Sequence, residues 1–249
     1  MIVLRTEQVR KYFGEVRAVD GVNLSLEKGV LTSVVGPNGA GKTTLVNLLS
    51  GLLAPDSGRI LFLDRDITRL PPNKRTRLGI GRCFQLVSLY EGLTAFDNIR
   101  IPVISAHGMA PNVISPLDGN ELITKRTEEI LGTFGLLEKK NTVAKDLPHG
   151  DKKILDIAVA YSLNPTLLLL DEPTSGVSTF EKTKVMQLIR DLIKSKGITA
   201  LVVEHDMDVV YSYSDKIVVL HQGSILAEGS PKDVMENPQV AKVFLGVEK

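Results

Sequence analysis

A glycine-rich segment at residues 36–43 reads GPNGAGKT, which fits the phosphate-binding pattern G-x-x-x-x-G-K-[ST]. Glycines let backbone N–H groups approach a highly charged phosphate chain closely, and a helix that begins there points its positive end at the same anion. Lys42 is expected to reach the β- and γ-phosphates of a nucleoside triphosphate, and the Thr43 hydroxyl is expected to ligate Mg²⁺. The residues expected to line the phosphates are Gly36, Pro37, Asn38, Gly39, Ala40, Gly41, Lys42, Thr43 and Thr44.

Two carboxylates end an apolar run later in the chain, where residues 167–172 read LLLLDE. Asp171 is the candidate to hold Mg²⁺ beside the nucleotide. Glu172 stands one residue further on, where it is the candidate general base for an attacking water. A strand that ends in Asp-Glu is common by itself, but together with the phosphate loop it predicts hydrolysis of a nucleoside triphosphate.

The elements that must position these residues alternate between strands and helices. Apolar periodicity predicts strands at 2–12, 16–26, 31–35, 58–63, 80–85, 166–171 and 198–203, and a hairpin at 216–220 and 224–228. Helices are expected at 43–50, 71–77, 121–137, 149–161, 179–196 and 206–213, with a helix starting at 94–99 and two short helices closing the chain. Residues 102–120 are rich in Pro, Gly, Asn and Ser, and predict a loop. This alternation implies a parallel sheet covered on both faces.

Composition narrows the function classes. The 249 residues suffice for one α/β domain with an inserted part, and the net charge of +1 offers no electrostatic reason to expect nucleic acid as the main partner. The single cysteine, Cys83, excludes an internal disulfide framework and fits a reducing cytosol. No stretch approaches the roughly 18–20 apolar residues that cross a bilayer, and the first residues fit neither a signal peptide nor an anchor. Any membrane role is therefore expected to come through a partner.

Taken in order, the motifs of the whole chain resemble those of the ATPase subunits of ATP-binding cassette (ABC) transporters. The series is Phe13 before Gly14, GPNGAGKT, Gln85, LPHGDKK at 147–153, LLLLDEPTSG at 167–176 and EHD at 204–206. The resemblance implies one domain over residues 1–249. It is expected to be an α/β P-loop NTPase core with a parallel sheet, an N-terminal antiparallel β part and a helical subdomain inserted at about 88–163.

The resemblance also implies a role for each matching residue. Phe13 would stack on the adenine of ATP, the alternative being a core aromatic on an early strand. Gln85 would sense Mg²⁺ and water beside the contact with a membrane subunit, and His205 would contact the γ-phosphate and position the water. The expected catalytic residues are Glu172, His205, Gln85 and Lys42, and the expected Mg²⁺ ligands are Thr43, Gln85 and Asp171.

In this family two ATPase subunits face each other head to tail, and a short segment of one chain covers the ATP held by the other. Here that segment reads Leu147, Pro148, His149, Gly150 and Asp151, where the family pattern is Leu-Ser-Gly-Gly-Gln. Either Pro148 occupies the first helical position while Asp151 complements the positive helix end, or the segment grips the partner's γ-phosphate poorly. Ser178 also replaces a usual Asp. These departures suggest pairing with a different ATPase subunit and two unequal sites, with a homodimer left open.

The C-terminal part, from VVEHDM at 202–207 to NPQVAKVFLG at 237–246, resembles a narrower group, the ATPases of branched-chain amino acid importers and related amide or urea importers. That resemblance implies integral membrane permease subunits, a second ATPase subunit and, indirectly, a solute-binding protein as partners. It also implies a peripheral place on the cytoplasmic face of the cell (inner) membrane. A lipopolysaccharide-export ATPase is the near alternative, although Glu204 and the insert at 102–120 favour the importer. A soluble ABC ATPase of iron–sulfur assembly is the alternative from another class.

Overall fold

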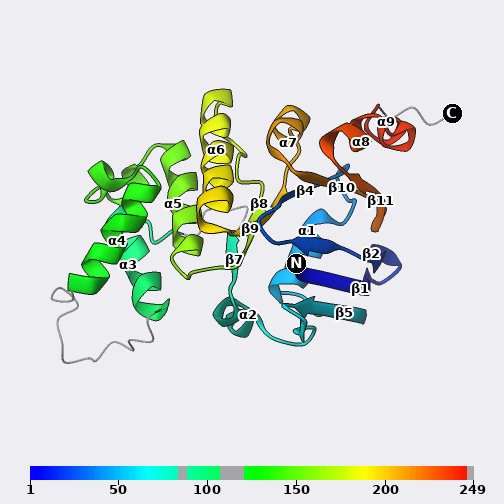
Figure 1. The fold of residues 1–249 in the computed structure, drawn as a ribbon, viewed down its shortest axis with the longest axis horizontal. Coiled ribbons are helices and arrows are strands. Elements are labelled where there is room, and N and C mark those ends of the chain that lie inside the picture. The colour runs from blue at the N-terminus through cyan, green and yellow to red at the C-terminus, as the bar shows by residue number, and fades with distance from the viewer. Residues whose placement is uncertain (84–88, 107–120, 246–249) are drawn as a thin grey trace.

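The computed structural model describes residues 1–83, 89–106 and 121–245. In Figure 1 a group of helices lies on one side, the strands of a central sheet occupy the middle, and an antiparallel β part with the last helices lies on the other side. No helix within the described ranges has both the length and the apolar character needed to cross a membrane.

The central sheet has six strands in the order β11-β10-β4-β9-β8-β7. They are β4 (Leu31–Val35), β7 (Ile80–Cys83), β8 (Leu167–Asp171), β9 (Thr199–Val203), β10 (Lys216–His221) and β11 (Ser224–Gly229). All neighbours are parallel except β10 and β11, which form the predicted hairpin. Strands β4, β8 and β9 are buried along their whole length, as expected of a sheet covered on both faces. The predicted parallel sheet is therefore confirmed.

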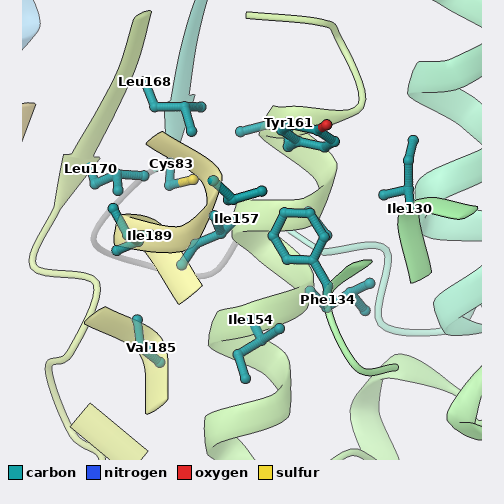
Figure 2. Close-up of a cluster of buried hydrophobic side chains, with 14 of the residues drawn as sticks. Cys83, Ile130, Phe134, Ile154, Ile157, Tyr161, Leu168, Leu170, Val185 and Ile189 are labelled. Atoms are coloured by element: carbon teal, nitrogen blue, oxygen red, sulfur yellow. The ribbon is translucent and has the colours of Figure 1, made fainter. Parts of the chain in front are cut away.

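Alternate residues of β8 belong to two different cores. Leu168 and Leu170 join the core formed with α5 (His149–Tyr161) and α6 (Thr179–Lys196), and Figure 2 shows Leu170 beside Ile189 of α6 in this cluster. Leu167 and Leu169 point to the opposite face, where α1 (Lys42–Ser50) and the N-terminal strands cover them. Burial on both faces explains why this strand reads as an unbroken apolar run.

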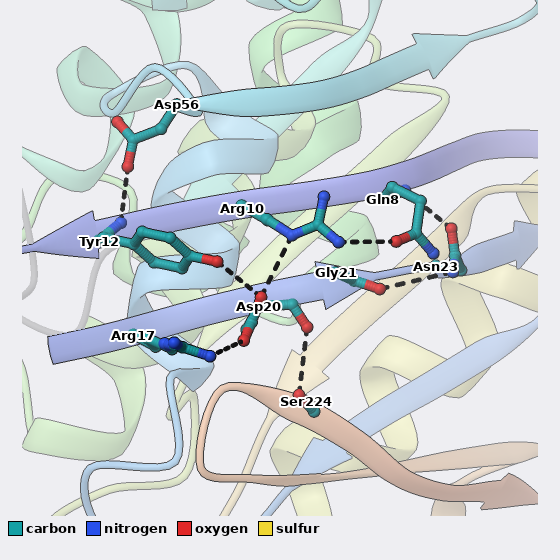
Figure 3. A network of polar contacts seen from close by, with 9 residues as sticks. All are labelled: Gln8, Arg10, Tyr12, Arg17, Asp20, Gly21, Asn23, Asp56 and Ser224. Carbon is teal, nitrogen blue, oxygen red and sulfur yellow. Dashed lines mark hydrogen bonds and ion pairs between the residues drawn. The ribbon is translucent and has the colours of Figure 1, made fainter.

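The N-terminal part is an antiparallel sheet in the order β2-β1-β5-β6, with β3 also paired to β1. Its strands are β1 (Ile2–Phe13), β2 (Val16–Val22), β3 (Ser25–Glu27), β5 (Ser57–Phe62) and β6 (Arg65–Asp66). Figure 3 shows how this sheet is joined to the central one, since Ser224 of β11 donates a hydrogen bond to the Asp20 carbonyl oxygen at 3.1 Å. The Asp20 carboxylate in turn accepts from the Tyr12 hydroxyl at 2.7 Å and from Arg10 Nε at 3.2 Å.

The single strand predicted at 16–26 is divided in the structure. The Thr6 hydroxyl of β1 lies at the break, where it donates to the Val22 carbonyl at 2.9 Å and accepts from the Leu24 N–H at 2.8 Å. A side chain thus replaces ladder bonds that a continuous strand would have made. Sequence periodicity cannot reveal such a replacement, because the pattern of apolar residues continues through the break.

The helical group contains α3 (Ala95–Ala106), α4 (Glu121–Thr133) and α5, with α3 packed on both others. Two 3₁₀ turns, Leu137–Lys139 and Ala144–Asp146, connect α4 to α5. The predicted loop at 102–120 was wrong at its start, because α3 continues to Ala106 with Pro102 inside it. Residues 107–120 lie outside the described residues. The limits of the helical subdomain, 88–163, stay a prediction.

Pro102 is tolerated in α3 because it belongs to the buried face of the helix. Ala95, Asn98, Ile99, Pro102 and Val103 are buried at spacings of three and four residues. The apolar contacts of this face offset the hydrogen bond that the proline ring removes. The expected helix at 121–137 also ends earlier, at Thr133, where Gly135 with φ +66° turns the chain.

The remaining helices of the described residues lie close to their predicted positions. They are α2 (Pro72–Leu78), α7 (Met207–Tyr213), α8 (Pro231–Met235) and α9 (Pro238–Leu245). Helix α7 begins after Asp206, whose carboxylate caps it by accepting from the Val209 N–H at 3.4 Å. The two short closing helices, α8 and α9, are the ones predicted for the end of the chain.

Candidate functional site

The glycine-rich segment connects β4 to α1, so it lies where the buried central strand ends and a helix begins. Gly41 caps the N-terminus of α1 with φ +103°, and a Cβ atom there would lie 2.1 Å from the Ala18 carbonyl oxygen. A Cβ atom on Gly36 would lie 2.1 Å from the Leu220 carbonyl oxygen. Only glycine fits these two positions, which leaves the N-terminus of α1 open to an anion.

Lys42 is the first residue of α1, and its side chain folds back over the loop. Its Nζ donates to the carbonyl oxygens of Gly36 at 2.7 Å and Pro37 at 3.0 Å. Burial lowers the pKa of Lys42, while the carboxylates of Glu172 and Asp171 oppose that shift. The lysine thus stands at the phosphate loop with both acidic candidates close enough to act on it electrostatically.

Asp171 ends β8 and is 3% exposed. Its carboxylate lies beside the guanidinium of Arg82 on the neighbouring strand β7. Arg82 Nη2 lies 3.6 Å from Asp171 Oδ2, and Arg82 Nη1 donates to Ser50 Oγ of α1 at 2.5 Å. Burial raises the pKa of Asp171, and Arg82 lowers it. The other oxygen, Oδ1, is buried and has no hydrogen-bond partner among the described residues.

This orphaned carboxylate oxygen is suited to a hard divalent cation. Mg²⁺ characteristically takes one or two protein oxygens together with substrate phosphates and water, rather than a cage of side chains. The Thr43 hydroxyl, one residue after Lys42, is exposed at the start of α1 and can supply a second protein oxygen. The donor set therefore fits Mg²⁺ bound to a nucleotide.

Glu172 and His205 meet at the ends of two adjacent parallel strands, β8 and β9. His205 Nε2 lies 2.8 Å from Glu172 Oε1, and both side chains retain access to solvent. Glu172 has φ +52°, a left-handed conformation that is uncommon for a residue with a side chain. Its N–H donates to the Val203 carbonyl at 3.0 Å, which ties the turn after β8 to the end of β9.

Phe13 ends β1 and is 48% exposed, which excludes the alternative of a core aromatic. Lys11 Nζ lies 5.6 Å from the centre of its ring. An exposed ring followed by a turn at Gly14 can stack on a planar base. Gln85, the remaining candidate catalytic residue and Mg²⁺ ligand, lies outside the described residues.

The segment 147–151 lies elsewhere, at the start of α5. Pro148 is the N-cap, and the helix begins at His149, which is its predicted first residue. Of the two alternatives for Pro148, the one that places it at the first helical position is therefore wrong by one residue. Asp151 forms ion pairs with Lys139 and, at 3.8 Å, with Lys184. Within the described part of the chain, the hydrogen bonds and ion pairs of this segment do not reach residues 36–44.

Gly150 and Ser178 bring this segment against the start of α6. A Cβ atom on Gly150 would lie 2.4 Å from Glu181 Oε1, so a larger residue there would have to displace the Glu181 side chain. Glu181 also completes a capping box with Ser178, whose N–H donates to Glu181 Oε2 at 3.0 Å. Ser178, which stands where the family pattern has Asp, therefore serves as the N-cap of α6.

Sequence reasoning missed two charged residues of the site, Arg82 and Glu204. Arg82 had a readable signal, because a charge inside a predicted buried strand requires a partner. Glu204 was noted only for its place before His205, although its carboxylate is buried and accepts hydrogen bonds from Thr174. Neither partner can be identified from spacing along the chain.

Comparisons with known proteins agree with this geometry. A family model described as "ABC transporter" matches residues 19–175. A probable branched-chain amino acid transport ATP-binding protein, LivG, from Archaeoglobus fulgidus is 35% identical and covers 100% of this chain and 97% of its own length. A solved ADP conformation of an ATP-binding cassette of an ABC transporter has a TM-score of 0.88 and 33% identity, and the match covers 99% of each chain. A dimeric, post-hydrolysis cassette bound to ADP and phosphate has a TM-score of 0.77 and 29% identity over 92% of this chain and 98% of that one.

Proposed function

Because this chain belongs to the ABC transporter family and is an ATP-hydrolysing subunit of it, we propose that it energises the import of branched-chain amino acids. The sequence pattern leaves a related amide or urea as the alternative solute. The observation that carries the ATPase part is the meeting of Lys42, Asp171, Glu172 and His205 around the phosphate loop. The full-length similarity to an ATPase named for branched-chain amino acid transport supports the substrate class.

The proposed reaction is in-line attack of water on the γ-phosphate of ATP, which yields ADP and phosphate. The backbone N–H groups of the loop and Lys42 bind the phosphates, and Thr43 and Asp171 Oδ1 would hold Mg²⁺. Mg²⁺, when bound, neutralises charge on the β- and γ-phosphates. Glu172 takes the proton of the attacking water. His205, whose Nε2 lies 2.8 Å from the Glu172 carboxylate, orients this water and contacts the γ-phosphate. Gln85 is proposed as a further contact to Mg²⁺ and the water.

We further propose that the chain works in a pair. Phe13 stacks on the adenine of its own ATP, while Leu147, Pro148, His149, Gly150 and Asp151 cover the ATP of a second ATPase subunit. The exposed positions of Pro148 and His149, and the hydrogen bonds of the segment away from residues 36–44, support this assignment. The Pro148 and Ser178 departures favour a different subunit as partner, with unequal sites. Equal, fast hydrolysis at both sites of a purified homodimer would count against that asymmetry.

The proposed location is the cytoplasmic face of the cell (inner) membrane, where the chain would attach through integral membrane permease subunits. Solute would reach those permeases from a solute-binding protein, which this chain would contact only indirectly. Nucleic acid is not expected as a partner, since the net charge is +1.

Solute uptake tests this proposal directly. Cells that lack the chain are assayed for uptake of labelled leucine, urea and a short aliphatic amide, and are then complemented with the wild type or with Glu172→Gln. Loss of leucine uptake that only the wild type restores is the expected result. Normal leucine uptake without the chain would refute the amino acid assignment. Copurification with a soluble complex, and with no integral membrane protein, would favour the iron–sulfur alternative, and altered lipopolysaccharide transport would favour export.

A further inference from the structure

The carboxylate of Glu204 is buried at the end of β9, directly before His205, and the proposed hydrolysis does not use it. The residue is 4% exposed. Its Oε1 accepts hydrogen bonds from the Thr174 backbone N–H at 3.1 Å and from the Thr174 hydroxyl at 2.7 Å. Its Oε2 accepts from the His205 backbone N–H at 3.3 Å. The Glu204 side chain thus joins the His205 backbone, after β9, to Thr174 in the turn after β8.

Together with the contact between Glu172 and His205, these bonds form a closed ring that runs through Glu172, Thr174, Glu204 and His205. Thr174 follows Glu172 by two residues, and His205 follows Glu204 directly. The Glu172 N–H donates to Val203 at 3.0 Å, and His205 Nε2 lies 2.8 Å from Glu172 Oε1. Each half of the pair is therefore connected to Glu204 by a short path through the backbone.

Glu172 needs such support, because its φ of +52° is costly for a residue with a side chain. A conformation of this kind persists only where the surrounding contacts over-determine it. The bond to Val203 lies on one side of Glu172, and the bonds from Thr174 to Glu204 lie on the other. A carboxylate suits the place, since its two acceptor oxygens serve donors from both turns, whereas an amide has only one acceptor oxygen.

We propose that Glu204 is a positioning residue that, through Thr174, sets the His205 imidazole against the Glu172 carboxylate. The inference rests on the proposed ATP hydrolysis at Glu172. Glu204 and Thr174 do not touch the reacting atoms. They act by fixing the distance between the two residues that do, and a misplacement of about 1 Å at a reacting centre is enough to cost about 100-fold in rate.

A matched pair of substitutions separates positioning from general stability. Thr174→Val removes the hydroxyl at nearly constant volume, and Thr174→Ser keeps the hydroxyl. We expect Thr174→Val to lower kcat for Mg²⁺-ATP about tenfold while the affinity for a fluorescent ATP analogue stays unchanged, and Thr174→Ser to retain most of the turnover. Glu204→Gln breaks the His205 side of the ring, and adding Thr174→Val to it is expected to lower kcat little further, because the two residues act as one unit.

Wild-type turnover in Thr174→Val would overturn the inference. So would a parallel loss of turnover and ATP affinity that Thr174→Ser does not repair, since that pattern indicates a structural defect. Hydrogen exchange of the His205 amide supplies a readout that needs no turnover. Faster exchange in Glu204→Gln is expected, and unchanged exchange would count against the ring even if the wild type proved inactive. An inactive wild type would sink the proposed ATPase role, and this separates the two failures.

Discussion

Replacing Arg82 by methionine is the perturbation whose magnitude the structure allows us to work out most directly. The side chains of Arg82 and Asp171 are 9% and 2% exposed, and Arg82 Nη2 lies 3.6 Å from Asp171 Oδ2. Methionine keeps much of the length of the arginine side chain but leaves the buried carboxylate without that countercharge. Breaking a buried pair by removing one partner costs about 3–5 kcal/mol. We take the lower end, about 3 kcal/mol, because Lys42 still lowers the pKa of Asp171 when Arg82 is absent.

For a chain of this size, each kcal/mol shifts the melting temperature by about 2–4 °C, so Arg82→Met should lower it by about 6–12 °C. Thermal and urea unfolding of the nucleotide-free protein provide the measurement. Two controls isolate the cause. Ser50→Ala removes the 2.5 Å bond from Arg82 Nη1 together with the bond that the Ser50 hydroxyl donates to the Asn47 carbonyl at 3.2 Å, and should cost about 1 kcal/mol. Arg82→Met combined with Asp171→Asn should regain most of the lost stability, because the unpaired buried charge is gone.

The reasoning fails if Arg82→Met unfolds within about 0.5 kcal/mol of the wild type, which is the range of ordinary surface substitutions. It also fails if adding Asp171→Asn recovers nothing. In that case the loss would come from the packing and the other hydrogen bonds of the arginine side chain, not from the charge of Asp171.

Glu172→Gln should lower turnover by about 100- to 10 000-fold while ATP binding persists, because only the general base is removed. The same substitution should trap the closed dimer. A phosphate-release assay checks the turnover and gel filtration with ATP checks the dimer, and retained turnover would refute the role of Glu172. Lys42→Ala should weaken ATP binding about 10- to 100-fold in equilibrium titration, since a charged donor to the phosphates is lost, and unchanged affinity would contradict this. Asp206→Asn keeps the cap of α7 but loses the 2.7 Å ion pair with Lys182, which solvent screens to about 0.5 kcal/mol. The Lys182 hydrogen bond holds the Asp206 pKa below its usual 3.8. The wild type should therefore be more stable than Asp206→Asn by the full amount above pH 3.8, and this difference in unfolding free energy should vanish as pH falls through the lowered pKa. A difference that persists in acid would contradict the ion pair as its cause.

The prediction from local composition differs most clearly from the structure at Pro102. Proline, glycine and asparagine predicted a loop from residue 102, but the structure continues α3 to Ala106. A local window shows that proline removes a hydrogen bond. It does not show that α4 and α5 lie against α3 and bury the Pro102 face. The division of the second strand at Thr6 has the same origin, because Thr6 is distant in sequence from the strand that it interrupts.

The sequence by itself determined the fold class, the phosphate loop and the place of the acidic residues at strand ends. Each of these depends on periodicity or on residues that are neighbours in the chain: glycines 36 and 41 around one loop, and Asp171 and Glu172 after one apolar run. Tertiary structure decided which strands are adjacent. Because β8 lies between β7 and β9, Asp171 meets Arg82, and Glu172 meets His205 from a different strand. Glu204 and Thr174 are 30 residues apart, and only the sheet order brings them within hydrogen-bond distance.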